Sequence, residues 1–202
     1  MRGVEQIPWL YDACCSVAER FGLHRWRRWL VDGARGRTLE VGCGTGRNLP
    51  LYRPGVRVVA IEPWADALTR ARRRAPSAVL VQATAEALPF RASVFDTVVS
   101  ALVFCSVADA DAGLAEVHRV LRTDGSLRMI EHVRSTRPWK ARFQDRFARA
   151  WRRCTGGCHW NRDTEASVRR AGFTIDVATR RARGDMRRFA ATLLAPPGTM
   201  KP

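Results

Sequence analysis

A glycine-rich segment that directly follows a short apolar run constrains the fold most. Residues 38–41 have the composition of a buried strand, and the next five residues are Gly42-Cys43-Gly44-Thr45-Gly46. Glycine lets the backbone turn tightly and lets a ligand approach it closely. Such a turn after a strand is typical of the edge at which an open α/β sheet binds its ligand. The segment therefore predicts an α/β sheet with a ligand crevice beside Gly42.

Short apolar runs alternate with longer amphipathic segments in the rest of the chain, as in a parallel α/β sheet. We expect strands at residues 38–41, 56–61, 78–81, 97–102 and 127–130, and helices at residues 45–51, 65–74 and 110–121. Thr123-Asp124-Gly125 has the composition of a helix stop and turn. Further helices are expected at residues 139–153 and 163–171, and strands at 173–178 and 189–194 with a basic turn at 180–185. The short last connection predicts a hairpin, and hence one antiparallel strand in a Rossmann-like, doubly wound, mostly parallel sheet of seven strands.

Composition fits one globular domain. The 202 residues are 46% hydrophobic, enough for a sizeable core. Residues 1–37 should form a helical lid over the crevice, with one or two helices at residues 9–31, and residues 38–202 the ligand-binding domain. The apolar runs fall short of the roughly 20 residues of a membrane span, and residues 1–17 lack the features of a secretory signal. We therefore expect a cytoplasmic protein.

The formal net charge of +16 comes almost entirely from arginine. Such a field attracts anionic substrates, anionic membrane surfaces or nucleic acid. The basic residues are spread over most helices without an aromatic-basic recognition motif, which disfavours nucleic acid. Peripheral contact with an anionic membrane stays open.

The six cysteines are expected to be free thiols. Cys154, Cys158 and His159 have a spacing that resembles part of a zinc site, but no second Cys/His pair follows. We therefore predict no metal.

Two acidic residues flank the predicted crevice. The loop departs from the dinucleotide pattern Gly-x-Gly-x-x-Gly because Gly46 comes one residue early. Glu40 just before the loop suits a cationic ligand better than a pyrophosphate. Glu62 ends the second strand, where a carboxylate can accept hydrogen bonds from both ribose hydroxyls. A ribonucleoside that carries positive charge is the predicted ligand; Trp64 either lines its adenine side or caps a helix.

Four motifs resemble those of class I S-adenosylmethionine-dependent methyltransferases: residues 39–46 (LEVGCGTG), 60–63 (AIEP), 85–90 (AEALPF) and 95–99 (FDTVV). The resemblance implies that the three loop glycines cradle the methionine part, that Glu62 holds the ribose and that the backbone of Ala85 meets the adenine edge. The cofactor site that it implies comprises Glu40, Gly42, Cys43, Gly44, Gly46, Asn48, Glu62, Pro63, Thr84, Ala85, Glu86, Ser100, Ala101 and Leu102. Thr84 departs from the family, which often has Asp there to bind the adenine amino group.

Further segments are similar to the microsomal methyltransferase-like thiol methyltransferases and their bacterial relatives. They are Asn48 and residues 102–107 (LVFCSV), 116–122 (EVHRVLR), 131–133 (EHV) and 157–164 (GCHWNRDT). The chain lacks the N-terminal hydrophobic anchor of the microsomal proteins, which favours a soluble form.

The acceptor side is less sharply predicted. His132, at the end of the fifth strand, is the first candidate for a catalytic residue because imidazole titrates near neutrality; a histidine satisfied at a strand end is the alternative. Cys105 is the second candidate, with pocket lining as its alternative. Tyr11, His159 and Arg162 are candidates for acceptor binding, against core packing, a solvated loop or a helix cap. Trp9, like Tyr11, either belongs to the lid or packs in the core.

Three functions compete. The narrower resemblance favours methylation of a small-molecule acceptor, best a thiol, because a cationic environment raises the thiolate fraction. A phospholipid or quinone-type methyltransferase is the alternative, with the basic helices docking on an anionic bilayer. A non-catalytic module that binds the cofactor or RNA is the alternative from another class.

Overall fold

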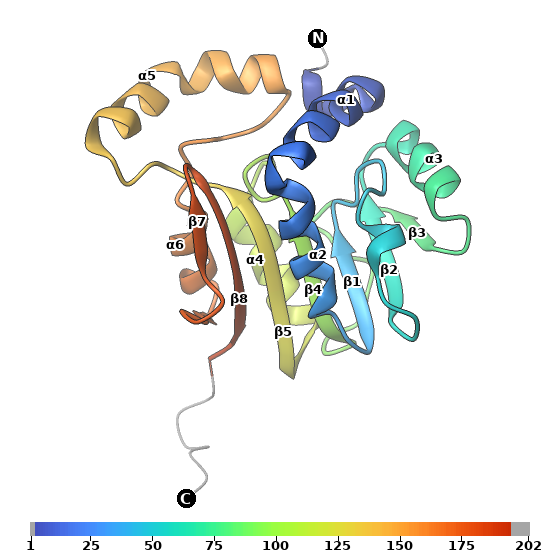
Figure 1. The fold of residues 1–202 in the computed structure, drawn as a ribbon. Coiled ribbons are helices and arrows are strands. Elements are labelled where there is room, and N and C mark those ends of the chain that lie inside the picture. Colours follow the sequence, from blue (N-terminus) through green and yellow to red (C-terminus); the bar gives the residue numbers. More distant parts are fainter. Residues whose placement is uncertain (1–2, 195–202) are drawn as a thin grey trace, which may run out of the picture.

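The computed structural model describes residues 3–194, which build one sheet with helices on both faces (Figure 1). The strand order is β3-β2-β1-β4-β5-β8-β6, and β7 pairs with the first three residues of β8. The strands are β1 (Arg37–Val41), β2 (Arg57–Glu62), β3 (Val79–Gln82), β4 (Phe95–Ala101), β5 (Leu121–His132), β6 (Phe173–Ile175), β7 (Arg181–Arg183) and β8 (Met186–Leu193). Only β8 runs antiparallel to its neighbours on the main path. The predicted Rossmann-like sheet of seven strands with one antiparallel strand is confirmed.

The C-terminal strands differ from the sequence prediction in detail. The expected basic turn at residues 180–185 contains an extra strand, β7, because the chain reverses over Gly184, whose φ is +57°. The strand expected at residues 173–178 ends at Ile175, since the amides of Thr179 and Arg180 donate to the carbonyl of Asp176 in a turn. The strand expected at residues 189–194 is β8, which starts earlier than expected, at Met186, because its first residues pair with β7.

The helix expected at residues 45–51 does not form. Three glycines of the loop have positive φ, and Pro50 lacks the N–H that a helix interior needs. Only the short 3-10 helix η3 (Leu49–Leu51) remains. The expected turn at Thr123-Asp124-Gly125 is an irregularity inside β5 instead, because Phe95 pairs with Leu121 while Thr97 already pairs with Ser126.

Helices cover both faces of the sheet because alternate strand residues are apolar on both sides. α4 (Ala110–Val120) and α6 (Thr164–Arg170) pack on one face, where Leu114 and Val168 meet Leu127 in the largest core cluster. On the other face, α2 (His24–Asp32) places Leu30 against Ile130. α3 (Ala65–Arg74) packs beside β2 and β3.

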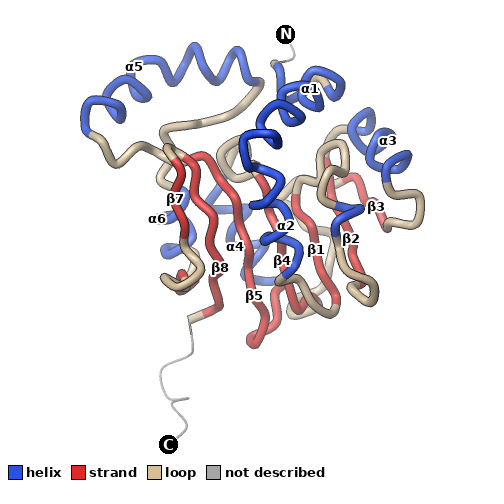
Figure 2. The backbone as a smooth tube through the Cα atoms, viewed as in Figure 1, coloured by secondary structure: helices blue, strands red, loops and turns tan. Residues whose placement is uncertain are grey.

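The N-terminal segment begins with a short 3-10 helix, η1 (Val4–Gln6), and continues as α1 (Pro8–Ala18). A kink in η2 (Glu19–Leu23), where Gly22 has a φ of +100°, turns the chain from α1 into α2. Figure 2 shows α1 above the edge of the sheet at which the parallel strands end, and α2 across its face. The long helix α5 (Pro138–Thr155) lies apart from the sheet, next to the N-terminal segment. Within residues 3–194, none of the helices combines the length and apolarity needed to cross a bilayer.

Candidate functional site

A cavity of about 340 Å³ opens at the carboxyl ends of β1, β2 and β4, and residues of η1 and α1 also line it. This volume lies in the range of small-molecule sites. Nine of the predicted cofactor residues line it: Gly42, Gly44, Glu62, Pro63, Thr84, Ala85, Glu86, Ala101 and Leu102. The predicted crevice is therefore a real cavity, and its position matches the edge at which open α/β sheets bind ligands.

The glycine loop leaves backbone rather than side chains along the cavity wall. Gly42 has a φ of +65°, and a Cβ there would lie 2.5 Å from Val103. A Cβ on Gly44 would point toward Tyr11, whose ring lies 3.8 Å away. Leu102 on the floor also has a positive φ, of 61°, a conformation that bulky side chains rarely adopt. The chain thus accepts unfavourable backbone geometry at this place, as is common at binding sites.

Glu62 is buried at the end of β2 and is held in place by two amides. Its Oε2 accepts from Gly44 N at 2.9 Å, and its Oε1 accepts from Trp64 N at 3.2 Å. Burial raises the pKa of this carboxyl, against the lowering by the two amides. Because each carboxylate oxygen has further lone pairs, Glu62 can still accept two hydroxyl protons from a ligand in the cavity. A ribose is the natural ligand for such a rigid pair of acceptors.

Five predicted cofactor residues do not reach the cavity. Cys43 and Gly46 face the core beside Ala71, where a Cβ on Gly46 would lie 2.9 Å from Ala71 Cα. Asn48 is buried below the loop and donates to Glu40 Oε1 at 2.9 Å, while its own Oδ1 accepts from Arg27 at 2.8 Å. Glu40 is thus part of an internal polar network, not a ligand contact. Ser100 is likewise buried, and its hydroxyl donates to Glu131 Oε1 at 3.3 Å.

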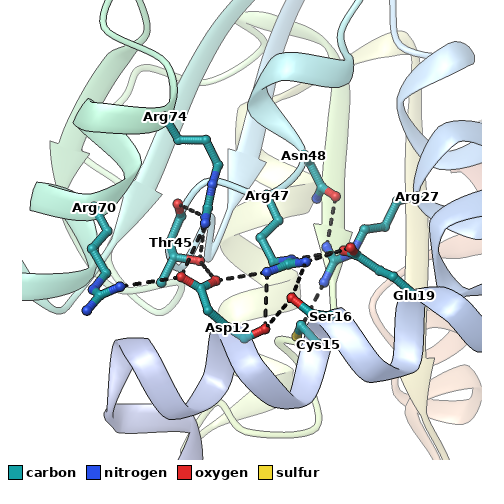
Figure 3. Close-up of polar contacts among 10 residues, drawn as sticks. All are labelled: Asp12, Cys15, Ser16, Glu19, Arg27, Thr45, Arg47, Asn48, Arg70 and Arg74. Atoms are coloured by element: carbon teal, nitrogen blue, oxygen red, sulfur yellow. Dashed lines mark hydrogen bonds and ion pairs between the residues drawn. The ribbon is translucent and has the colours of Figure 1, made fainter.

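A network centred on Asp12 ties α1 to the glycine loop (Figure 3). The Asp12 carboxylate accepts from Thr45 Oγ1 at 2.6 Å and forms ion pairs with Arg47, Arg70 and Arg74 at 3.1, 3.6 and 3.2 Å. Burial alone would raise the pKa of Asp12, but the hydrogen bonds from Thr45, Arg74 and Arg47 outweigh it and hold the pKa below its usual value.

Arg47 connects the same loop to the end of α1. Its guanidinium donates two hydrogen bonds to the Glu19 carboxylate, of 2.9 and 2.5 Å. The N-terminal helix α1 is therefore fastened to the glycine loop at both Asp12 and Glu19. Tyr11 lines the cavity from α1, whereas Trp9 is 61% exposed and does not belong to the lining. Trp64 lines the cavity next to Pro63.

Cys105 and His132 lie close together with Cys158, next to Ser106 of the cavity lining. Cys158 Sγ is 3.9 Å from His132 Nδ1, and both sulfurs are completely buried. A hydrogen bond from the Cys105 thiol and the nearby His132 lower the pKa of Cys158 to about 4, against the effect of burial. Burial would lower the pKa of His132, but Cys158 raises it above its usual value.

Glu5 lines the cavity near these groups. Its Oε2 accepts from Ser106 Oγ at 2.7 Å. Burial and the neighbouring Cys158 raise the pKa of Glu5 to about 7. Sequence reasoning missed Glu5, because a single acidic residue near the N-terminus carries no local signal.

Glu131 is buried beneath the cavity, and its carboxylate accepts from the amides of Val103, Phe104 and Cys105 at 3.0–3.1 Å. Glu131 thus fixes the loop that forms the cavity floor.

Arg162 has a structural position rather than the expected acceptor-binding one. Its Nη1 donates to the carbonyls of Phe104 and Val107, at 2.5 and 2.8 Å. It does not line the cavity, because those carbonyls hold it behind the floor. His159 also lies outside the lining, and its amide donates to the Cys105 carbonyl at 2.6 Å. Both residues therefore join the segment after α5 to the loop after β4.

A family model described as "Methyltransferase domain" matches residues 39–129. Thiol S-methyltransferase TMT1A of Homo sapiens is 33% identical over 144 residues, which cover 67% of this chain and 59% of that protein. Phosphatidylethanolamine N-methyltransferase of Cereibacter sphaeroides is 36% identical over 108 residues, which cover 50% of this chain and 53% of that protein. The chain thus spans less than two thirds of these relatives' length.

The fold has similar solved structures as well. A crystal structure of a SAM-dependent methyltransferase from Thermotoga maritima, described as a possible histamine N-methyltransferase, superposes with a TM-score of 0.65. It is 21% identical, and the match covers 90% of this chain and 97% of that chain. The likeness shows that the two proteins share their fold.

Proposed function

Because the chain belongs to the class I methyltransferases, whose methyl donor is S-adenosylmethionine, we propose that it transfers this methyl group to a small thiol. The observation that carries the donor site is the buried Glu62 carboxylate, fixed by Gly44 N and facing a cavity at the end of β2. The similarity to a thiol S-methyltransferase supports the acceptor class.

The residues that line the cavity suit the parts of the donor. Glu62 would accept from the ribose hydroxyls, and the backbone at Gly42 and Gly44 would lie against the methionine part. Thr84 to Glu86 would border the adenine. S-adenosylmethionine supplies an electrophilic methyl group on a sulfonium, so the protein mainly has to position the acceptor and exclude water. We propose residues 1–37 as the lid that does so, since Tyr11 lines the cavity and Asp12 fastens α1 to the loop.

The acceptor thiol must lose its proton before it attacks the methyl carbon. Glu5 is the group best placed to receive it, because its pKa of about 7 lets it accept a proton near neutral pH and it lines the cavity. His132 stays a candidate catalytic residue through its contact with Cys158, and the Cys105 sulfur lies beside the same two groups.

The test is incubation of purified protein with S-adenosylmethionine labelled in the methyl group and separate panels of thiols, amines, phenols and phospholipid vesicles. We expect label on a thiol and a slower reaction of the Glu5→Gln variant at neutral pH. Turnover of amines alone would refute the thiol proposal. Binding of the donor without transfer to any panel would favour a non-catalytic module.

A lipid acceptor is the second candidate, and one surface favours it. Trp139, Phe143 and Phe147 on α5 are 66%, 49% and 46% exposed, and their spacing of four residues puts them on one face of the helix. Arg142, Arg146 and Arg149 accompany them. Aromatic and basic side chains on one helix suit the surface of an anionic bilayer.

Sedimentation with anionic and zwitterionic vesicles tests this surface. The lipid acceptor would be favoured over the thiol by two results together. The protein binds anionic vesicles alone in a salt-sensitive way and loses this binding when the three aromatic residues are replaced by alanine, and the methyl label appears on a phospholipid.

A further inference from the structure

Three side chains with metal-binding atoms meet next to Ser106 of the cavity lining. The two sulfurs of Cys105 and Cys158 and a ring nitrogen of His132 all lie within 4.8 Å of one another. They come from the loop after β4, the end of β5 and the loop after α5, so only the tertiary fold brings them together. Cys154, which the sequence pairs with Cys158, is exposed and is not one of the three.

The spacing of these atoms suits a tetrahedral zinc site. Zinc binds thiolate at about 2.3 Å and imidazole at about 2.0 Å, which puts neighbouring ligand atoms roughly 3.5–3.8 Å apart. The observed 3.9 Å between Cys158 Sγ and His132 Nδ1 is close to that separation. The remaining distances require movements of about 1 Å or less to bring the atoms onto one ion.

Hydrogen bonds fix the backbone of the loops that carry the two cysteines. Cys105 N donates to Glu131 Oε2 at 3.1 Å, and Cys158 N donates to Thr155 Oγ1 at 3.2 Å. The amide of His159 joins both loops by its bond to the Cys105 carbonyl. Such fixation of the backbone behind the ligands is what preserves the geometry of a metal site.

Among the residues that the structure describes, the group has three ligands, not four, and none of the three lines the cavity itself. Structural zinc sites have four protein ligands, whereas sites that act on a substrate keep the fourth position open. Two residues that line the cavity adjoin the group: Ser106 Oγ lies 3.6 Å from Cys105 Sγ, and Glu5 Oε2 accepts from Ser106 Oγ at 2.7 Å. A ligand in the cavity would therefore approach the ion beside Ser106 and Glu5.

We propose that Cys105, Cys158 and His132 bind Zn²⁺ and that the acceptor thiol occupies the fourth position, a step that rests on the proposed thiol methylation. The thiol proton passes to Glu5 or water when the sulfur binds. A sulfur lone pair then forms the bond to the methyl carbon while the carbon–sulfonium bond breaks, and that electron pair stays on the sulfur of S-adenosylhomocysteine.

Metal binding is tested first, without turnover. Reduced wild-type protein is titrated with Co²⁺, whose thiolate charge-transfer absorption and visible bands report tetrahedral sulfur ligation, and then with Zn²⁺ to displace it. We expect one site per chain, with the charge-transfer absorption reduced in Cys105→Ser and Cys158→Ser and the tetrahedral bands lost in His132→Ala.

Cys154→Ser and His159→Ala are matched controls, since they alter the two neighbours of Cys158 that the sequence offers as ligands. Both should keep the wild-type spectrum. Loss of the spectrum in either control, or no charge-transfer absorption in the wild type, would overturn the site.

If the variants fail to fold, the metal site can still be measured directly in the wild-type protein. X-ray absorption at the zinc edge should give two sulfur neighbours and an imidazole; a shell of nitrogen and oxygen alone overturns the proposal. So does a Cys105–Cys158 disulfide, found by mass spectrometry, that persists in protein isolated with zinc.

The acceptor step has its own readout. A small thiol added to the Co²⁺ protein with S-adenosylhomocysteine should shift the visible bands. No shift overturns the fourth-position step and leaves the metal site intact. A shift without methyl transfer refutes the proposed function but supports the metal site, so the two failures are distinguishable.

Discussion

The carboxylate of Asp12 accepts a hydrogen bond from Thr45 Oγ1 at 2.6 Å, which joins the helix above the cavity to the glycine loop below it. The same carboxylate faces three arginine side chains, two of them from α3. Asp12, together with Glu19, which Arg47 binds, therefore holds α1 over the cavity.

Asp12→Asn should weaken the binding of S-adenosylhomocysteine. The substitution keeps the side-chain volume but removes the charge that holds Arg47, Arg70 and Arg74, so α1 covers the cavity less of the time. We expect a loss of roughly 5- to 10-fold in affinity by calorimetry, equivalent to about 1 kcal/mol. Asp32→Asn is the control, because the ion pair of Asp32 with Arg53 is exposed on both sides. Equal affinity of the Asp12 variant and the wild type would contradict the lid.

Glu62→Gln should weaken the same ligand more strongly. Charge-assisted hydrogen bonds contribute about 1.5–3 kcal/mol each, so the loss should be roughly 10- to 100-fold. Glutamine keeps one oxygen, and the melting temperature shows whether the contact with Gly44 N survives. Asp111→Asn, on the exposed surface of α4, is the control. A folded Glu62 variant that binds as tightly as the wild type would place the nucleoside elsewhere.

The strands and the loop were predictable from sequence because their signals are local. Local sequence alone indicates the conformation of these parts, which are the apolar runs of β1, β2 and β4 and the glycines between residues 42 and 46. The failed helix at residues 45–51 had a local warning too, since Pro50 sits within it.

The acceptor side could not be predicted because its contacts link distant segments. His132 and Cys158 are 26 residues apart, and Glu5 meets Ser106 across 101 residues. Only packing decides such pairs. Glu40 shows the reverse error: its motif position predicted a ligand contact, but the side chain of Asn48 meets it inside the protein.

Glu40 should make stability fall as the pH rises. Burial raises its pKa to about 7 in the folded protein, against about 4.5 in the unfolded chain. The folded state therefore binds more protons between these two values, and this contribution to stability is complete below pH 4.5 and is lost as the pH rises through 7. Relative to Glu40→Gln, the wild type should lose roughly 3 kcal/mol of unfolding free energy between pH 4.5 and 8. Urea unfolding of both proteins across this range measures it, and parallel pH profiles would contradict the buried carboxyl.

Arg162→Ala should cost stability before it affects acceptor binding. The guanidinium holds the carbonyls of Phe104 and Val107, and removal leaves these groups without their partner, at a cost of about 2–3 kcal/mol in urea unfolding. Arg153→Ala, an exposed change on α5, should stay within about 0.5 kcal/mol of the wild type. Arg162→Lys should recover part of the loss, because an ammonium can donate to both carbonyls but lacks the fixed fork. If Arg162 instead contacted an anionic acceptor, the alanine variant would raise KM for anionic acceptors alone and unfold at the wild-type urea concentration. The two measurements together therefore decide whether Arg162 stabilises the floor of the cavity or binds the acceptor inside it.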